Sequence, residues 1–321
     1  MIALIGGSGF IGTRLATRLK EDGKKVVILD VEKSSAFPDN WKWCDVRDKD
    51  SLRKALQGCD VIINLAAEHK DNVTPLSLYD EVNVDGARNV GLVADELGIK
   101  KIIFTSSVAV YGLPKNETDE TGVFNHFNDY GRTKLLAEKE YEKWFAKGDN
   151  KSLLVVRPTV VFGEGNRGNV YNLLAQIASG KFLMIGDGNN RKSMIYVENV
   201  VALLMILLDK TGYIVVNAVD KPDYTMNELV KEVNLVMGKG EDAGRKIRIP
   251  YWLGYLGGIG FDLLAAIMQK ELPISSVRVK KFCATTQFKS NTIASLNFTP
   301  PVPLREGLER TLKTEFLNHR S

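Results

Sequence analysis

The sequence contains few of the residues that build metal centres and disulfide frameworks. Its 321 residues include three cysteines and three histidines, which are widely scattered and form neither a CxxC pair nor a metal-ligand spacing. Scattered cysteines of this kind are typical of small core side chains in a reducing compartment. We therefore expect free thiols and no metal site.

Charge of one sign and long apolar runs are also scarce. The net charge is only +4, and charged residues make up 26% of the chain. So small an excess argues against nucleic acid as a partner, but it favours an anionic ligand or an anionic membrane surface. Met1–Ile5 lacks the basic start and the longer apolar stretch of a signal peptide, and no charge-free run has the length of a membrane-spanning helix. We therefore expect a cytoplasmic protein.

Short apolar runs alternate with longer amphipathic ones through the first half of the chain. This alternation is typical of an α/β protein with a doubly wound parallel sheet, the Rossmann arrangement. The predicted strands are Ile2–Ile5, Lys25–Asp30, Val61–Leu65, Lys101–Ser106, Leu153–Arg157 and Tyr213–Ala218, and the predicted helices are Gly12–Asp22, Asp48–Gln57, Val82–Leu97 and Tyr130–Lys147.

The pattern becomes looser after residue 158, where glycine-rich loops alternate with helices. We expect residues 1–163 to form a dinucleotide-binding domain, to which residues 193–217 return. Residues 164–192 and 218–321 are expected to form a smaller substrate-binding region.

A glycine-rich turn follows the first predicted strand. Gly6, Gly9 and Gly12 stand three residues apart between this strand and a helix. In such a setting the first glycine permits the tight turn, the second lets the backbone approach a pyrophosphate, and the third lets helix and strand pack closely. Free N–H groups at the helix start then face the phosphates. The pattern predicts a dinucleotide site at Gly6, Gly9, Phe10, Ile11 and Gly12.

The end of the second predicted strand indicates which dinucleotide binds. Asp30 lies 18 residues beyond Gly12, where a carboxylate accepts both ribose hydroxyls and repels the 2′-phosphate of NADP. NAD is therefore the expected cofactor. The other predicted cofactor contacts are Asp45 and Val46, near the adenine, and Leu65, Ala66 and Ala67, at another strand end.

A serine and a Tyr-x-x-x-Lys motif form the predicted catalytic set. Tyr130 and Lys134 share one face of a helix because they are four residues apart. A tyrosine is a poor base at neutral pH, and a nearby ammonium together with a positive nicotinamide ring lowers its pKa. Lys134 is also expected to hold the nicotinamide ribose. Ser107, at the end of the fourth predicted strand, is expected to bind the same substrate oxygen as Tyr130.

Together these motifs resemble the extended short-chain dehydrogenase/reductase family of nucleotide-sugar epimerases and dehydratases. The resemblance covers nearly the whole chain and implies that Pro158 also contacts the cofactor. It further implies that NAD stays bound as a prosthetic group, and that two protomers pair through the Val82–Leu97 and Tyr130–Lys147 helices. The matching segments are Gly6–Gly12, Asp30, Ser106–Gly112, Tyr130 with Lys134, and Arg157–Pro158.

Two positions depart from the family pattern. Ile5 replaces a frequent threonine, which should matter little. Val108 and Ala109 stand where 4,6-dehydratases carry an acidic pair, so epimerisation or simple oxidation is expected instead of dehydration. The resemblance implies a reversible oxidation at sugar C4, in which Tyr130 takes the hydroxyl proton and the hydride passes to NAD⁺. The 4-keto sugar then turns over and receives the hydride on its other face.

A sugar diphosphate requires backbone donors and cations. In the family an arginine usually stands where this chain has Lys192, so the point charge of an ammonium replaces a planar guanidinium with several hydrogen-bond donors. For each candidate cation a solvated surface position is an equally good interpretation. The candidate substrate contacts are Asn169, Arg191, Lys192 and Arg278, with Lys280 and Lys281 as further cations.

Ile249–Met268 is almost wholly apolar, with aromatic residues at one end and Asp262 as its single charge. Four glycines and Pro250 argue against a stable membrane-spanning helix. The aromatic end and the basic flanks favour a segment at a membrane interface. A buried lid or a subunit contact remains open. The flanking cations are Arg245, Lys246, Arg248 and Lys270.

Three longer stretches resemble a narrower group of the family, the bacterial 4-epimerases of N-acetylglucosaminyl-diphospho-undecaprenol. The stretches are Ala67–Asp71, Arg167–Leu174 and Ser275–Phe288. The resemblance implies conversion of lipid-linked GlcNAc to GalNAc for surface-polysaccharide (O-antigen) repeat units, with the enzyme peripheral at the inner face of the cell membrane. A soluble UDP-N-acetylglucosamine or UDP-glucose 4-epimerase and a non-catalytic NAD-binding scaffold stay open as alternatives.

Overall fold

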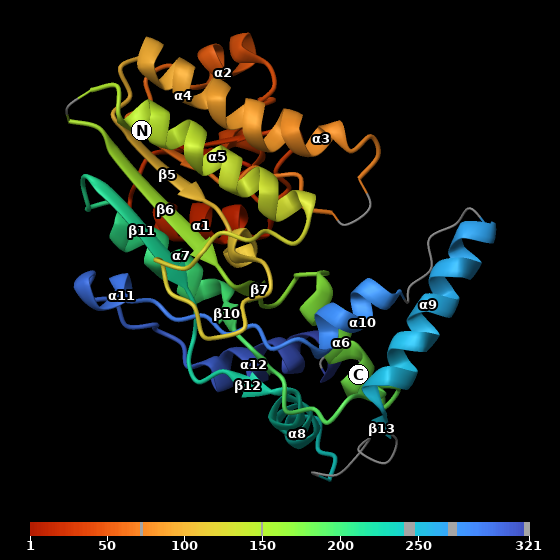
Figure 1. Cartoon of the computed structure of the whole chain (residues 1–321). Helices are drawn as coiled ribbons and strands as arrows, with labels where there is room; N and C mark the ends of the chain where they lie inside the picture. The colour runs from red at the N-terminus through yellow and green to blue at the C-terminus, as the bar shows by residue number, and fades with distance from the viewer. Residues whose placement is uncertain (71–72, 149, 241–247, 269–274, 318–321) are drawn as a thin grey trace.

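The structure is a computed structural model that describes residues 1–70, 73–148, 150–240, 248–268 and 275–317. A seven-stranded sheet lies at its centre, and all neighbouring strands in it are parallel (Figure 1). The strand order is β11-β6-β5-β4-β1-β2-β3, so the chain starts in the middle and builds both edges in turn. The strands are β1 (Ile2–Ile5), β2 (Val26–Asp30), β3 (Trp41–Trp43), β4 (Val61–Asn64), β5 (Lys101–Thr105), β6 (Ser152–Pro158) and β11 (Tyr213–Ala218).

Helices cover both faces of this sheet because successive strand residues point to opposite faces and both sets are apolar. Leu4 and Ile28 pack with Leu15 on one face, whereas Ala3 and Val27 pack in the cluster of the other face. The first face is covered by α1 (Phe10–Glu21) and α7 (Val197–Leu207), and the second by α2 (Lys49–Ala55), α4 (Gly86–Glu96) and α5 (Asp129–Phe145).

The predicted doubly wound α/β fold is confirmed, and β1 and β11 have the predicted bounds. The Val82–Leu97 prediction covers only part of a longer helical run, which begins with α3 (Ser77–Tyr79) and continues through a π-helical turn, η2 (Asp80–Asp85), into α4. The edge strand β3 was not predicted. Cys44 and Cys59 are buried thiols, as expected.

A third apolar cluster is built by different helices, which lie below the sheet in Figure 1. Its main contributors are α6 (Asn169–Ser179), α8 (Met226–Val236) and α12 (Leu304–Leu312). Within residues 193–217, α7 and β11 return to the large sheet. The separate cluster supports a smaller region after residue 163, but the exact domain bounds stay a prediction.

The remaining elements are short, apart from one helix at the edge of the molecule. This helix, α9 (Tyr251–Met268), packs on α10 (Ser276–Cys283) (Figure 1). Among the described helices, none has both the length and the apolar character needed to cross a bilayer. Three two-stranded sheets pair β7 (Val160–Phe162) with β10 (Met194–Tyr196), β9 (Arg191–Lys192) with β12 (Tyr224–Thr225), and β8 (Met184–Ile185) with β13 (Arg248–Ile249); the other elements are η1 (Pro38–Asn40), η3 (Val108–Tyr111), α11 (Thr292–Ser295) and η4 (Lys313–Leu317).

Candidate active site

The glycine turn between β1 and α1 is packed so closely that side chains would not fit. Gly6 has φ +73°, and a Cβ there would lie 2.5 Å from the backbone nitrogen of Ala66. A Cβ on Gly12 would lie 2.6 Å from the Cα of Gly7. The turn therefore lies directly against the end of β4, and α1 against the turn. The structure brings the predicted residues of the turn together with Leu65 and Ala66, as expected.

The start of α1 fits the pyrophosphate of a dinucleotide. Its N-cap is Gly9, no described side chain caps its N–H groups, and its first turn contains no acidic residue. Such a helix start attracts an anion. Asp30 lies beside it at the end of β2, where its carboxylate accepts the Ser8 N–H and the Glu32 N–H, each at 3.0 Å. The residues present thus fit NAD: the helix start suits the pyrophosphate, and the Asp30 carboxylate lies beside it, where the adenosine ribose is expected.

The predicted adenine contacts lie at the end of β3. The Asp45 carboxylate is hydrogen-bonded to the Arg47 guanidinium, with Nη2 to Oδ2 at 2.6 Å, and this bond is the main reason why the pKa of Asp45 is lowered. Val46 packs against α4, because a Cβ on Gly86 would lie 2.7 Å from its side chain. Contact of either residue with adenine stays a prediction, as does the contact of Pro158 at the end of β6.

Ser107 and Tyr130 are brought together by two closely packed backbone turns. Ser107 is the N-cap of η3, and its Oγ accepts the Ala109 N–H at 3.1 Å. The start of α5 lies against η3, since a Cβ on Gly131 would come within 2.4 Å of the Ala109 carbonyl oxygen. The Ser107 side chain lies close to the Tyr130 phenol as a result and acts to lower its pKa. The predicted pair is therefore assembled.

The protein alone does not acidify the Tyr130 hydroxyl. Burial raises the pKa of Tyr130 above its usual value, while the hydrogen bond with Ser107 opposes the rise and Tyr79 adds to it. The expected lowering of this pKa by Lys134 is not the dominant effect in this structure. A further positive charge near the phenol is therefore needed to release its proton at neutral pH.

Lys134 is buried beside Tyr130 on the same face of α5. Its side chain is 2% exposed, and Nζ lies 4.3 Å from the centroid of the Phe104 ring. Burial lowers the pKa of Lys134 to about 7, and the carboxylate of Glu138, one further turn along α5, opposes this shift. An aromatic face and a carboxylate thus replace water around this ammonium.

A buried polar network continues from Glu138, and the sequence reasoning missed it. The Arg157 guanidinium donates to the Glu138 carboxylate from Nη2 at 2.6 Å and from Nε at 3.0 Å, and Ser106 Oγ donates to the same group. Arg157 Nη1 also donates to the Tyr111 hydroxyl at 2.5 Å, which in turn donates to Asn217 Oδ1 at 3.1 Å. The network ties α5 to the ends of β5, β6 and β11.

A buried asparagine holds the segment after β4 in place. Asn83 Nδ2 donates to Thr133 Oγ1 at 2.9 Å and to the Glu68 carbonyl at 3.0 Å, and its Oδ1 accepts the Glu68 N–H at 2.8 Å. The segment that contains Ala66 and Ala67 is thereby fixed to α5. No motif in the sequence marks Asn83, whereas Glu138 stood one helical turn beyond Lys134 and was open to prediction.

Lys192, a predicted diphosphate contact, is turned toward the protein. Its Nζ donates to the carbonyls of Lys281 at 2.8 Å and Ala284 at 2.5 Å, at the end of α10. Burial lowers the pKa of Lys192 to about 8. Arg191 donates from Nη1 to the Asp223 carbonyl at 2.8 Å. Lys192 therefore anchors α10 to β9, and a contact of either cation with substrate stays a prediction.

The other two predicted substrate contacts lie at helix starts. Asn169 is the first residue of α6, whose N-cap Gly168 provides no side-chain hydrogen bond. Arg278 is exposed in the first turn of α10, and its N–H donates to Ser275 Oγ at 3.1 Å. Lys192 and Arg278 thus both involve α10, while Asn169 lies on a separate helix.

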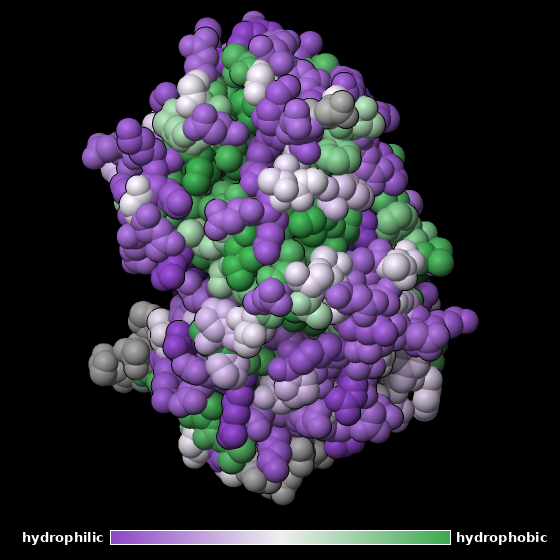
Figure 2. Space-filling model, turned by 90° about the vertical axis from the view of Figure 1, so that its left-hand side faces the viewer, coloured by the Kyte–Doolittle hydropathy of each residue, from purple (hydrophilic) through white to green (hydrophobic). Residues whose placement is uncertain are grey.

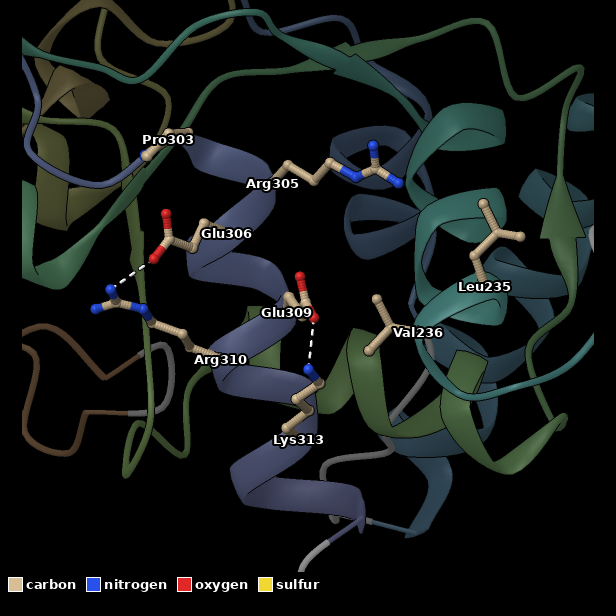
Figure 3. Close-up of a pocket in the computed structure, with 8 residues that line it drawn as sticks. All are labelled: Leu235, Val236, Pro303, Arg305, Glu306, Glu309, Arg310 and Lys313. Atoms are coloured by element: carbon tan, nitrogen blue, oxygen red, sulfur yellow. Dashed lines mark hydrogen bonds and ion pairs between the residues drawn. The ribbon is translucent and has the colours of Figure 1, made fainter.

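The larger described cavity, about 800 Å³, is not at the predicted site (Figure 3). It lies between α8 and α12, and four of its charged side chains form two ion pairs, Glu306 with Arg310 at 2.6 Å and Glu309 with Lys313 at 2.5 Å. A second cavity, about 450 Å³, lies where α9 begins and α10 ends. The second cavity is lined by Ile185, Gly186, Asp187, Asn190, Tyr251, Lys280, Cys283 and Ala284.

Comparison with known proteins agrees with this site. The sequence pattern of the NAD dependent epimerase/dehydratase family matches residues 2–218. The N-acetyl-alpha-D-glucosaminyl-diphospho-ditrans,octacis-undecaprenol 4-epimerase of Escherichia coli O157:H7 is 49% identical over 320 residues, which cover 99% of this chain and 96% of that protein.

Two solved structures share the fold. UDP-glucose 4-epimerase of Thermotoga maritima with UDP-glucose superposes with a TM-score of 0.78 at 21% identity, covering 100% of this chain and 99% of the other. The UDP-glucose 4-epimerase of Thermus thermophilus in complex with NAD superposes with a TM-score of 0.74 at 19% identity, covering 98% of each chain. With the glycine turn, the Ser107–Tyr130 pair and the matching pattern over two thirds of its length, the chain belongs to the NAD-dependent epimerase/dehydratase family.

Proposed function

We propose that this protein inverts C4 of the N-acetylglucosamine in N-acetylglucosaminyl-diphospho-undecaprenol and so produces the N-acetylgalactosamine epimer. The observation that carries the chemistry is the approach of the Ser107 side chain to the Tyr130 phenol, with Lys134 one turn farther along the same face of α5. The choice of substrate is supported by the 49% identity, over 99% of the chain, to the Escherichia coli O157:H7 relative that is named for it.

NAD is proposed to lie across the carboxyl ends of β1, β2 and β4. The uncapped start of α1 would hold the pyrophosphate, Asp30 the adenosine ribose and Lys134 the nicotinamide ribose. When bound, NAD⁺ supplies a hydride acceptor and a positive ring, which is the additional charge that Tyr130 needs to release its proton.

The protein's own part is to move one proton at the C4 oxygen. Ser107 and Tyr130 hold this oxygen between their hydroxyls, and Tyr130 removes its proton as C4 is oxidised. Lys134, kept charged in part by Glu138, stabilises the phenolate. After the 4-keto sugar has turned over, C4 takes the hydride back on its opposite face, and Tyr130 returns the proton to the same C4 oxygen.

The turn after Ser107 favours epimerisation over dehydration. Elimination of water requires a group that removes a proton from carbon and a group that protonates the leaving hydroxyl. Val108 is buried and Ala109 carries no proton-transferring group. The 4-keto sugar is therefore expected to be reduced again without loss of water.

The proposed substrate sets the place of action and the biological role. A polyprenyl diphosphate is held in a bilayer, so we infer that the protein works peripherally at the inner face of the cell membrane, in O-antigen repeat-unit synthesis. We also propose a homodimer that pairs through α4 and α5, on whose outer surfaces Leu92 and Leu136 are exposed.

The substrate is tested by giving the protein lipid-linked GlcNAc and UDP-linked GlcNAc side by side and following GalNAc formation by chromatography. We expect conversion of the lipid-linked sugar only. Fast turnover of the UDP-sugar without turnover of the lipid-linked sugar would assign the protein to the soluble alternative.

The chemistry is tested with Tyr130→Phe, which removes the proton-transferring hydroxyl. We expect epimerisation to fall by a factor of about 10² to 10⁴ while NAD remains bound. The control is Tyr213→Phe, which removes a hydroxyl that donates to Glu142 at 2.9 Å on the protein surface and should leave turnover unchanged. A Tyr130→Phe protein with native turnover would remove Tyr130 from the mechanism. A native protein that binds NAD but turns over neither sugar would favour a binding scaffold.

A further inference from the structure

Helix α9 carries its large apolar side chains on its outer face. Trp252, Leu256, Ile259, Leu263 and Ile267 follow one another at intervals of three or four residues, so they share one face of the helix. Their exposed fractions lie between 37 and 80%. A surface helix normally turns such a face toward the core. This face of α9 therefore has little cover from the part of the chain that the structure describes.

The opposite face of α9 packs against the protein through small and polar residues. A Cβ on Gly254 would lie 2.6 Å from the Ile185 side chain, and a Cβ on Gly258 would lie 2.7 Å from the Ser276 backbone. Asp262, one turn farther on, accepts the Ser276 N–H at 3.2 Å and the Ser276 hydroxyl at 2.6 Å. Close approach through glycine thus fixes which face of α9 points outward.

This packing argues against a lid that closes over the core. Turning the apolar face inward would break the contacts of Gly254 and Gly258 and would leave the Asp262 carboxylate without its Ser276 partners. Asp262 is the only carboxylate of α9, and its bonds are made inside the helix pair. The outer face consequently presents no carboxylate to whatever covers it.

The neighbouring helix supplies positive charge. α10 contains Arg278, Lys280 and Lys281 and no carboxylate. Lys280 lines the same cavity as Tyr251, the first residue of α9, so this cation lies close to the start of the apolar face. Two copies of the chain meeting through α9 would bring these cations together, whereas an anionic bilayer attracts them. Charge therefore favours a membrane over a second copy.

We propose that α9 is the surface by which this protein docks on a membrane, lying in the interface plane of an anionic bilayer with its outer face toward the acyl chains. The cations of α10 would then reach the headgroups. A flat orientation follows from the packed glycine face, which must stay on the protein. The side of the molecule away from α9 is covered largely by hydrophilic residues, around an apolar area in its middle (Figure 2). Docking on a bilayer rests on the proposed function, since a lipid-linked substrate is the reason for a bilayer to be the occupant.

Binding of the full chain to vesicles of phosphatidylcholine and phosphatidylglycerol tests the docking surface by co-sedimentation. We expect Leu263→Gln to weaken binding about tenfold and Leu256→Gln with Leu263→Gln about a hundredfold, because each leucine loses its transfer into the acyl region. The matched control is Leu235→Gln, an exposed leucine of α8, which should bind like the native protein. Lys280→Gln should weaken binding to these vesicles but not to vesicles of phosphatidylcholine alone.

Two results would overturn the proposal. One is native vesicle binding by the Leu256→Gln, Leu263→Gln protein. The other is loss of self-association in that variant, measured by sedimentation velocity, without loss of vesicle binding, which would make a second copy the occupant of the outer face of α9.

Failure of docking and failure of the proposed function are separated by a soluble substrate. GlcNAc diphosphate on a short prenyl chain needs no vesicle, so the double leucine variant should turn it over at the native rate and turn over the long-chain substrate in vesicles more slowly. If the native protein epimerises neither sugar but the variant still loses vesicle binding, only the proposed function fails. If both sugars are turned over equally by native protein and variant, only the docking proposal fails.

Discussion

Replacing Lys134 by methionine is expected to stabilise the protein at acidic pH while removing its activity. Lys134 is 2% exposed, and burial lowers its pKa from 10.5 to about 7. Since one pKa unit corresponds to about 1.4 kcal/mol, the charged ammonium lowers the free energy of unfolding by at most about 5 kcal/mol. Methionine fills the same space with an unbranched apolar chain, so most of this penalty should disappear in the variant.

The sign of the effect follows from proton binding. The unfolded chain keeps the proton of this lysine up to a pH near 10.5, whereas the folded protein loses it near pH 7. Between these values the unfolded state binds more protons, so the stability of the native protein rises with pH. Below pH 7 the full penalty is present. The advantage of Lys134→Met is therefore largest at about pH 6 and shrinks toward about pH 10.

Urea unfolding of the proteins after removal of bound NAD, followed by circular dichroism at both pH values, measures this difference. The matched control is Lys139→Met on the outer face of α5, whose ion pair with Glu142 at 2.8 Å lies on the surface and is worth less than about 1 kcal/mol. A Lys134→Met protein that is no more stable than the native one at acidic pH, or equally more stable at both pH values, would refute the reasoning.

Three further predictions concern the buried ion pair of Glu138 with Arg157 and the residues expected to bind NAD. Glu138→Gln leaves the Arg157 guanidinium buried without its partner and should lower the free energy of unfolding by about 3–5 kcal/mol. The double variant Glu138→Gln, Arg157→Gln should regain most of this stability. Urea unfolding that finds the single and the double variant equally destabilised would contradict this. Asp30→Ala should narrow the ratio of NADP to NAD dissociation constants measured by calorimetry, and an unchanged ratio would mean that this carboxylate does not face the ribose. Gly12→Ala should abolish NAD binding, because its Cβ would lie 2.6 Å from the backbone of the glycine turn, while Gly148→Ala, with open space around it, should not; NAD binding by the Gly12 variant would contradict the expected packing.

The central sheet was predictable because most residues of its strands are buried, so that the strands appear as short, mainly apolar runs. β1 and β11 have the bounds that this pattern predicts. β3 was not predictable in this way, because it has only three residues and two of their side chains are exposed. In so short an edge strand, the sequence pattern cannot be distinguished from that of a loop.

The glycines of Ile249–Met268 have a packing role that the sequence did not reveal. Four glycines argued against a membrane-spanning helix there, and none of the described helices could cross a bilayer, although α9 is helical from Tyr251 to Met268. Gly254 and Gly258 are the points where the helix touches its neighbours. Composition cannot distinguish a glycine that weakens a helix from one that permits close packing, because the difference depends on the partner surface. Three of the cations expected to flank this segment, Arg245, Lys246 and Lys270, lie outside the described residues.

The candidate site was predictable where its residues are neighbours along the chain or at strand ends. Tyr130 and Lys134 are related by helix geometry alone, and Ser107 follows from the end of β5. The pairing of Glu138 with Arg157 depends on how α5 packs over β6, which local spacing does not contain. Lys192 shows the same limit, because the direction of its ammonium is set by the carbonyls at the end of α10.

The hydrogen on C4 offers the most direct measurement of the central claim, which is that Tyr130 moves a proton while a hydride leaves and returns to the same carbon. Lipid-linked GlcNAc with deuterium at C4 is incubated with the protein in ordinary water, and the mass of the product sugar is determined. We predict GalNAc that retains its deuterium. Replacement of this deuterium by hydrogen from water would contradict the proposed chemistry.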